Sequence, residues 1–215
     1  MPMELDSYRY IAIEGPIGVG KTSLARRLAM LFDALPVLEQ PADNPFLAAF
    51  YRDAGRYAFQ TQTCFLLQRI TQLQAPLDPS LGERRFVADF MLEKNMLFSQ
   101  LTLSEAELQL YRQLHAQLRP QVRPPDLVIC LQAPPQVLLE RIARRGIGME
   151  EAISSDYLQQ LSDSYGNFFH HYEEAPVLTV NTEHLDPAHN DADLKVLLQH
   201  IEAMRGKRAF LNQGG

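Results

Sequence analysis

Five short apolar runs interrupt the 215-residue chain, and longer segments with apolar residues at helical spacing separate them. Continuous apolar runs of this length are typical of parallel strands buried on both faces. Strands that alternate with helices form a parallel sheet with helices on its two sides. The pattern predicts an α/β fold with a five-stranded parallel sheet, whose strands are Tyr8–Glu14, Pro36–Glu39, Phe86–Asp89, Leu127–Leu131 and Val177–Asn181.

Local signals mark several helix boundaries. Ser104 and Glu107 form a capping-box pattern, which opens a helix that continues to about residue 118. Pro134-Pro135 starts another helix, which carries three arginines and ends at Gly146. We expect a loop over residues 74–85 and a loosely held tail over about 205–215. No internal repeat divides the sequence, so we expect a single domain over residues 1–215.

The first expected strand leads into Gly-Pro-Ile-Gly-Val-Gly-Lys-Thr at residues 15–22, which matches the phosphate-binding pattern G-x-x-x-x-G-K-[ST]. Glycines let the backbone N–H groups of such a loop point at phosphate oxygens, and the helix that follows adds its positive end. Lys21 is expected to reach the β- and γ-phosphates, and Thr22 to bind Mg²⁺. The loop therefore predicts binding of a nucleoside triphosphate through Gly15, Gly18, Val19, Gly20, Lys21, Thr22 and Ser23.

Composition narrows the possible partners. The formal net charge of −6 argues against a nucleic-acid partner, because duplex binding needs a basic surface. Cys64 and Cys130, the two cysteines of the sequence, are scattered, which suggests a reducing compartment. Neither an apolar run long enough to span a membrane nor a signal-peptide pattern is present. We expect a cytoplasmic protein without a membrane partner.

Two acidic residues end expected strands. Glu39 ends the second strand and Asp89 the third, and ligands of open parallel sheets bind beyond the carboxyl ends of the strands. Asp89 is a candidate to organise Mg²⁺ or water, and Glu39 a candidate to orient or deprotonate an acceptor hydroxyl. Alternatively, each acid caps the helix that follows it.

The expected helix over residues 57–74 places Gln62, Leu66 and Arg69 on one face, with Phe65 beside them. An amide, an aromatic ring and a guanidinium together can grip a flat heterocycle. An amphipathic surface helix would show the same spacing, so both interpretations remain open.

Three arginines, Arg141, Arg144 and Arg145, lie near the end of another helix and precede a glycine-bracketed loop. Guanidinium groups beside such a loop suit a lid over about residues 141–153 that closes on the transferring phosphate. A solvated basic helix end is the alternative.

Taken together, these motifs resemble those of the bacterial and animal deoxynucleoside kinases, a family of P-loop kinases. The segment Leu38–Leu47 resembles the family's second-strand motif, a Glu followed by Asn-Pro-aromatic-Leu. The similarity extends from about Tyr8 to Asn181 and includes Phe50-Tyr51, Arg56–Gln62, Arg69, Asp89, Lys94, Leu97-Phe98, Arg141–Gly146 and Glu150.

The resemblance implies a three-layer P-loop kinase fold with an arginine-bearing lid, and transfer of the γ-phosphate of ATP to the 5′-hydroxyl of a deoxynucleoside. Glu39 matches the general base of the family, and Tyr51 with Glu150 matches the pair that holds the 3′-hydroxyl. Gln62 and Arg69 match residues that recognise the base, and this pair favours a purine. The lid arginines of the family are matched by Arg141 and Arg145, and a homodimer is expected by the same analogy.

Two departures from the family pattern stand out. The third strand of better-known members ends in an acid followed by Arg, whereas Phe90 follows Asp89 here. The triplet Glu83-Arg84-Arg85 imitates that motif but precedes the strand. We therefore expect Lys94 to supply the missing positive charge. Ile147 stands where the lid often has an arginine, and Arg144 is the candidate to compensate.

Two other functions remain open at this point. A nucleoside monophosphate kinase would need cations near the acceptor site, and Arg52, Arg56 and Arg69 are near Glu39 or Gln62 in the sequence. A nucleotide-dependent switch without phosphotransfer is the other, although the guanine-reading motif N-K-x-D is absent.

Overall fold

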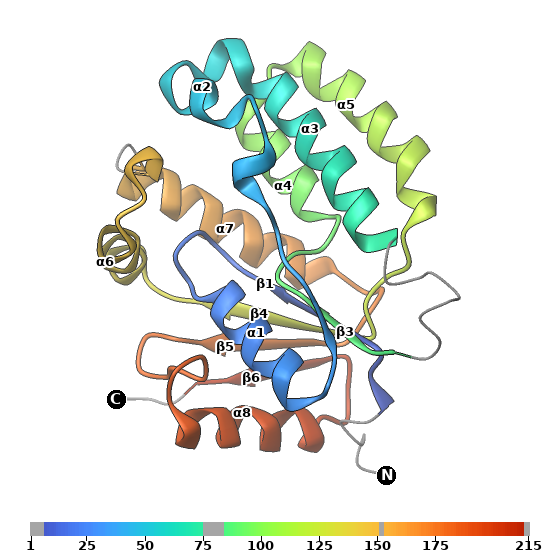
Figure 1. Cartoon of the computed structure of the whole chain (residues 1–215), viewed down its shortest axis with the longest axis vertical. Coiled ribbons are helices and arrows are strands. Elements are labelled where there is room, and N and C mark those ends of the chain that lie inside the picture. Colours follow the sequence, from blue (N-terminus) through green and yellow to red (C-terminus); the bar gives the residue numbers. More distant parts are fainter. Residues whose placement is uncertain (1–6, 75–83, 151–152, 213–215) are drawn as a thin grey trace.

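The computed structural model describes residues 7–74, 84–150 and 153–212. Within them, one parallel sheet has the strand order β2-β3-β1-β4-β5-β6 (Figure 1). The predicted α/β parallel-sheet fold is confirmed, but the sheet has six strands where five were expected. The strands are β1 (Tyr10–Glu14), β2 (Leu35–Val37), β3 (Phe86–Ala88), β4 (Leu127–Gln132), β5 (Val177–Asn181) and β6 (Arg208–Leu211).

The sixth strand corrects the expectation of a loosely held tail. Residues 208–211 pair with β5, and Leu211 packs into the core with only 3% of its surface exposed. Phe210 is 74% exposed, because β6 is an edge strand, and its mixed sequence gave no continuous apolar signal. Residues 213–215 lie outside the described residues, as does most of the expected loop, residues 75–83, with Glu83 in it.

Helices connect the strands and confirm the predicted boundaries. Ser104 and Glu107 form the expected capping box at the start of α5. The helix α6 starts at Pro135 and stops at Gly146, whose φ of 67° is left-handed. The α-helices are α1 (Lys21–Leu31), α2 (Leu47–Arg52), α3 (Ala54–Gln74), α4 (Lys94–Thr102), α5 (Glu105–Leu118), α6 (Pro135–Arg145), α7 (Ser155–His171) and α8 (Asp191–Ala203), with short 3₁₀ helices at Pro41–Asp43, Arg119–Gln121 and Gly148–Glu150.

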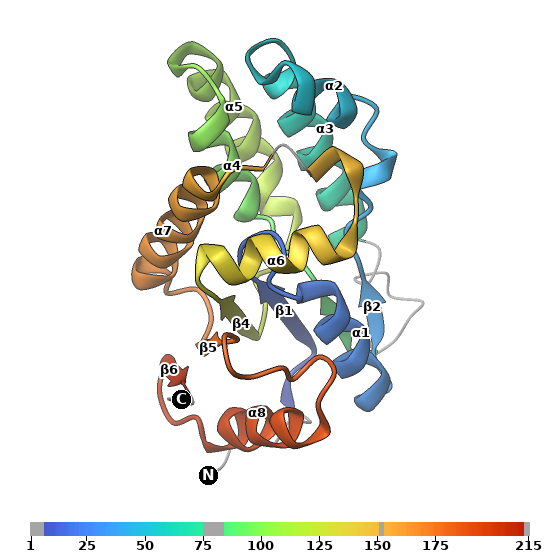
Figure 2. The same ribbon diagram turned by 90° about the vertical axis from the view of Figure 1, so that its left-hand side faces the viewer.

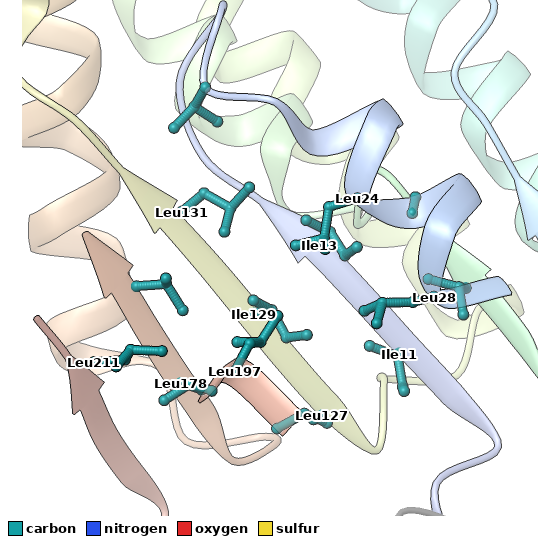
Figure 3. Packing of buried hydrophobic residues seen from close by; sticks show 14 of the residues in the cluster. Ile11, Ile13, Leu24, Leu28, Leu127, Ile129, Leu131, Leu178, Leu197 and Leu211 are labelled. Carbon is teal, nitrogen blue, oxygen red and sulfur yellow. The ribbon is translucent and has the colours of Figure 1, made fainter. Parts of the chain in front are cut away.

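Alternation along the strands divides the core into two layers. On β1, Ile11 and Ile13 pack with α1, α6 and α8, as Figure 3 shows for Leu24 and Leu28 of α1. Tyr10 and Ala12 face the other layer, formed by α3, α4, α5 and α7. The sheet thus lies between two helical layers, and α2–α5 extend above it in Figures 1 and 2. None of the described helices combines the length and apolar character needed to cross a membrane.

Candidate active site

The glycine loop after β1 has a backbone that requires glycine. Gly15 has a φ of +142°, and a Cβ added there would lie 2.3 Å from the carbonyl oxygen of Leu131. Gly18 has a φ of +84°, and a Cβ there would lie 2.8 Å from Cγ1 of Ile142 on α6. These positions let the loop pack closely against β4 and α6 before α1 begins at Lys21.

Lys21 folds back over this loop. Its Nζ donates hydrogen bonds of 2.9 Å each to the carbonyl oxygens of Gly15 and Pro16. Burial and the neighbouring charge of Lys94 lower the pKa of Lys21 to about 8. The ammonium is therefore incompletely neutralised by its surroundings, which favours an anionic ligand beside it.

Two cavities meet at the glycine loop. The first, of about 620 Å³, is bounded by the loop, the three lid arginines and the segment that follows β5. The second, of about 730 Å³, lies between the loop and helices α2, α3 and α4. Both cavities are lined by Gly18, Lys21, Thr22 and Arg145. The phosphate loop therefore separates two compartments that share a boundary.

The predicted loop and acceptor residues divide between these cavities. The first is lined by Gly18, Val19, Gly20, Lys21, Thr22, Ser23 and Arg144, whereas Gly15 lies behind the loop against β4. The second is lined by every residue that sequence reasoning placed around the acceptor: Glu39, Tyr51, Gln62, Phe65, Arg69, Asp89, Lys94 and Glu150. Segments far apart in the sequence thus converge on one chamber.

Asp89 connects the two sides of this chamber. The carboxylate accepts a 2.5 Å hydrogen bond from Oγ1 of Thr22 and a 2.7 Å hydrogen bond from the backbone N–H of Glu39. A hydroxyl and a carboxylate oxygen in contact are hard ligands of the kind that Mg²⁺ prefers. Their placement fits the pair that was expected to hold the metal.

Glu39 lies two residues past the end of β2, because the strand stops at Val37 and not at Glu39 as expected. Its Oε1 accepts from Nε of Arg69 at 2.8 Å, and its Oε2 from Nζ of Lys94 at 2.8 Å. Although burial opposes ionisation, the charges of Arg69 and Lys94 hold the pKa of Glu39 well below its usual range. The carboxylate is thus ionised and lines the same cavity as Lys21 and Thr22 of the phosphate loop.

Arg69 occupies the centre of this network. Besides Glu39, it donates a hydrogen bond to Oδ1 of Asn95, and its guanidinium lies 4.8 Å from the ring centre of Phe65. Gln62 and Arg69 are each only 3% exposed and Leu66 is fully buried, so the surface-helix interpretation of this face is wrong. The structure places Arg69 on the carboxylate of Glu39, whereas the resemblance assigns it to the base.

The lid arginines have different partners. Arg141 donates to Oγ1 of Thr182 at 2.9 Å and to the Thr182 carbonyl at 2.5 Å, beside the first cavity. Arg145 forms an ion pair with Glu150, and both line the second cavity with Tyr51. Burial and the charge of Glu150 raise the pKa of Tyr51 to about 12, which keeps its hydroxyl protonated. Arg141 and Arg145 therefore have specific partners, whereas Arg144 is exposed and lines the first cavity, so the alternative of a solvated helix end stays open for Arg144.

Sequence reasoning missed several polar residues of the site. Glu14 is fully buried and accepts hydrogen bonds from Gly15 N at 3.1 Å, Met91 N at 2.8 Å and the Tyr165 hydroxyl at 2.9 Å. It thereby ties the glycine loop to the segment after β3 and to α7. An acid that ends an apolar strand directly before the loop was the signal that could have revealed it. The partnership of Asn95 with Arg69 had no comparable local signal.

Comparisons with known proteins agree with this geometry. Residues 11–204 match the family model described as deoxynucleoside kinase. A deoxyguanosine kinase of Bacillus subtilis (strain 168) is 34% identical over 200 residues, covering 91% of this chain and 97% of the relative. A deoxyadenosine kinase of Dictyostelium discoideum is 34% identical over 209 residues, covering 95% of this chain and 82% of the relative.

Solved structures show the same fold. A deoxyadenosine kinase from M. mycoides with bound dATP superimposes with a TM-score of 0.76 at 20% identity, covering 90% of this chain and 100% of the other. The same enzyme with bound dCTP gives a TM-score of 0.75 at 19% identity over 91% of this chain and 100% of the other.

Proposed function

The chain belongs to the deoxynucleoside kinase family, and from this premise we propose that it phosphorylates the 5′-hydroxyl of a purine deoxynucleoside with ATP as donor. As a member of the family it is a phosphotransferase that acts on a hydroxyl group. The observation that carries the proposal is the pair of cavities that meet at Lys21, Thr22 and Arg145. The purine assignment is supported by the relatives named deoxyguanosine and deoxyadenosine kinase.

The first cavity suits the donor. Its lining carries Lys21 and the three lid arginines, against the single carboxylate of Asp186. Phosphoryl transfer depends mainly on holding the reactants in place and on stabilising negative charge, which such a lining supplies. Thr22 and Asp89 would hold Mg²⁺, which neutralises charge on the phosphate oxygens. Arg145 lines both cavities and can therefore stabilise the charge of the phosphoryl group as it passes from donor to acceptor.

Glu39 is the proposed acceptor base. A carboxylate with so low a pKa is a weak base, so it acts chiefly by accepting a hydrogen bond from the 5′-hydroxyl and aligning it for attack. In a loose transition state the hydroxyl loses its proton late, so alignment matters more than basicity. Lys94 contributes the positive charge beside Glu39 where other members have an arginine, and Arg69 holds the carboxylate from the other side.

Tyr51 and Glu150 are proposed to hold the sugar. The Tyr51 hydroxyl stays protonated and can donate a hydrogen bond to the 3′-hydroxyl oxygen, whereas the Glu150 carboxylate can accept a hydrogen bond from the 3′-hydroxyl. In the structure Glu150 is paired with Arg145, so binding of both substrates would draw the two groups to different partners. A closely walled site of this kind leaves little room for a 2′-hydroxyl.

No described feature favours a monophosphate acceptor. Arg52 and Arg56 do not line the second cavity, and Arg69 is already engaged by Glu39 and Asn95. Among the described residues that line the cavity, Arg69 and Lys94 are engaged by Glu39 and Arg145 by Glu150, which leaves only Lys21, at the phosphate loop, without a carboxylate partner.

The purified chain should be assayed by coupled ATP consumption with the four deoxynucleosides and with dAMP and dTMP. We expect turnover of a purine deoxynucleoside and none of the monophosphates. Glu39→Gln keeps the shape of the side chain but removes its charge, and should lower kcat by about a hundredfold or more. ATP binding without turnover of any deoxynucleoside would refute the proposal, and an unimpaired Glu39→Gln variant would remove Glu39 from the mechanism.

We also propose a homodimer, on family analogy. Leu66 and Leu73 on α3 and Leu97 on α4 are at most 5% exposed and belong to the core. The exposed leucines of the same helical layer are Leu67 on α3, at 52%, and Leu110 on α5, at 49%. These two are the better candidates for a surface between subunits.

A further inference from the structure

Three polar side chains on α3 and α4, those of Thr61, Gln62 and Thr102, line the second cavity without joining the Glu39 network. The Thr61 hydroxyl is buried and has no hydrogen-bond partner among the described residues. Gln62 is 3% exposed, and its backbone carbonyl accepts a 3.3 Å hydrogen bond from the Tyr111 hydroxyl. This part of the cavity is therefore polar and largely buried, and a hydrogen bond joins it to α5.

Thr102 is the described hydrogen-bond partner of the Gln62 side-chain amide. Its hydroxyl proton is donated to the carbonyl oxygen of Phe98 at 2.7 Å, so the hydroxyl oxygen is left as an acceptor. That oxygen accepts a 3.4 Å hydrogen bond from Nε2 of Gln62. A flipped amide would instead place Oε1 of Gln62 against the Thr102 oxygen, bringing two acceptors together. The Phe98–Thr102 bond thus holds the amide in one of its two orientations.

The orientation of an amide matters to a purine. At positions 6 and 1, adenine presents a donor and then an acceptor, whereas guanine presents an acceptor and then a donor. A side-chain amide that can flip matches either order, but a fixed amide matches only one for a given pose of the base. No described residue donates to Oε1 of Gln62, so this acceptor and the second N–H are available to a ligand.

On the premise of the proposed function, we propose that Thr102 is a positioning residue that fixes the Gln62 amide and so makes the enzyme distinguish 6-amino from 6-oxo purine deoxynucleosides. The rejected purine leaves buried polar groups of the site unpaired, which is the strongest form of discrimination available to a polar pocket. Thr61, with its unused hydroxyl, adds a second polar contact in the same region.

The test compares kcat/KM for deoxyadenosine and deoxyguanosine in matched variants. Thr102→Val removes the hydroxyl at constant shape, frees the amide to flip, and should move the ratio toward one by about tenfold, chiefly through KM. Thr102→Ser restores the hydroxyl and should restore the ratio. Thr71→Val is the control, because Thr71 makes the same kind of bond, to the Leu67 carbonyl, on the exposed face of α3.

The outcomes separate the two proposals. A parent enzyme that phosphorylates no deoxynucleoside refutes the proposed function itself. A parent that does so with equal preference for both purines, or a Thr102→Val variant that keeps the parental ratio, overturns the role of Thr102 alone. If Thr102→Val does not fold, Thr102→Ala serves in its place, with dissociation constants of the two nucleosides measured by calorimetry without ATP.

Discussion

At the scale of single residues, the site brings together charged side chains that are largely buried. Arg69 and Lys94 share the carboxylate of Glu39, and Asp89 accepts from Thr22 and from the backbone of Glu39. Lys21 binds only carbonyl oxygens among the described residues. A half-buried cation that contacts no carboxylate has lost part of its hydration without gaining an ion pair, so an anionic ligand there gains affinity.

The depressed pKa of Lys21 predicts proton uptake on triphosphate binding. At pH 8.5 the amine is largely neutral, because burial lowers its pKa to about 8. Phosphate oxygens favour the charged form and raise the pKa again, so binding takes up protons at pH 8.5 and little at pH 6.5, where the amine is already charged. Calorimetry in two buffers of different ionisation enthalpy measures the uptake.

Lys21→Ala provides the control for that titration. The variant should bind triphosphate more weakly and lose the buffer dependence at pH 8.5. Equal uptake in the parent and the variant would show that another group titrates.

Residue chemistry could be predicted where the sequence carries a local pattern. Lys21 and Thr22 follow from the glycine loop, and Glu39 and Asp89 follow from the ends of apolar strands. The wider hydrogen-bond network could not be predicted. Asn95, for example, contacts Arg69 only because α4 packs on α3. The same holds for Glu14, whose acceptor role depends on Met91 and on α7, both distant in the sequence.

At the scale of elements, α6 supports the phosphate loop and carries the lid arginines. Gly18 touches Ile142 and the carbonyl of Leu138 so closely that a Cβ would lie 2.8 and 2.9 Å from them. In Figure 2, α6 lies above α1 and crosses in front of the segment that joins β1 to α1. The loop and the lid thus share one support, and a displaced loop would displace Arg141 and Arg145 as well.

Gly18→Ala tests this support. The added methyl meets α6 at a left-handed φ, so we expect a loss of about 1–3 kcal/mol in stability and a clearly raised KM for ATP. Thermal unfolding and initial rates measure the two effects. Gly206→Ala is the matched control, because no atom lies within 4 Å of the added Cβ and its φ is not left-handed. Equal KM values for both variants would contradict close packing of the loop on α6.

Element prediction succeeded where the signal was continuous. Strands β1, β3, β4 and β5 were found because their apolar runs are buried on both faces, and α5 because of its capping box. The edge strand β6 was missed because only part of an edge strand is buried, which breaks the apolar run. The predicted strand Pro36–Glu39 corresponds to β2, which ends two residues earlier, at Val37. Among the described strands, this strand pairs with β3 alone.

At the scale of the whole molecule, the first cavity is basic although the chain as a whole is acidic. The chain carries a net charge of −6, yet the first cavity has four cationic side chains and one carboxylate. A basic cavity attracts small anions, whereas the net negative charge of the chain disfavours polyanions. The distribution suits a free nucleotide as the donor, in agreement with the proposed function.

The proposed homodimer concerns the apolar surface that the core leaves exposed. Leu67 on α3 and Leu110 on α5 expose about half of their surfaces, and α3 and α5 pack against each other. If the subunits meet there, Leu67→Glu combined with Leu110→Glu brings charges into an apolar interface and should convert the dimer to a monomer. Light scattering coupled to size exclusion measures the mass.

Met30→Glu is the control, because Met30 is 84% exposed but lies on α1, in the opposite helical layer. A parent that elutes as a monomer, or a double variant that stays dimeric, would exclude this surface as the interface.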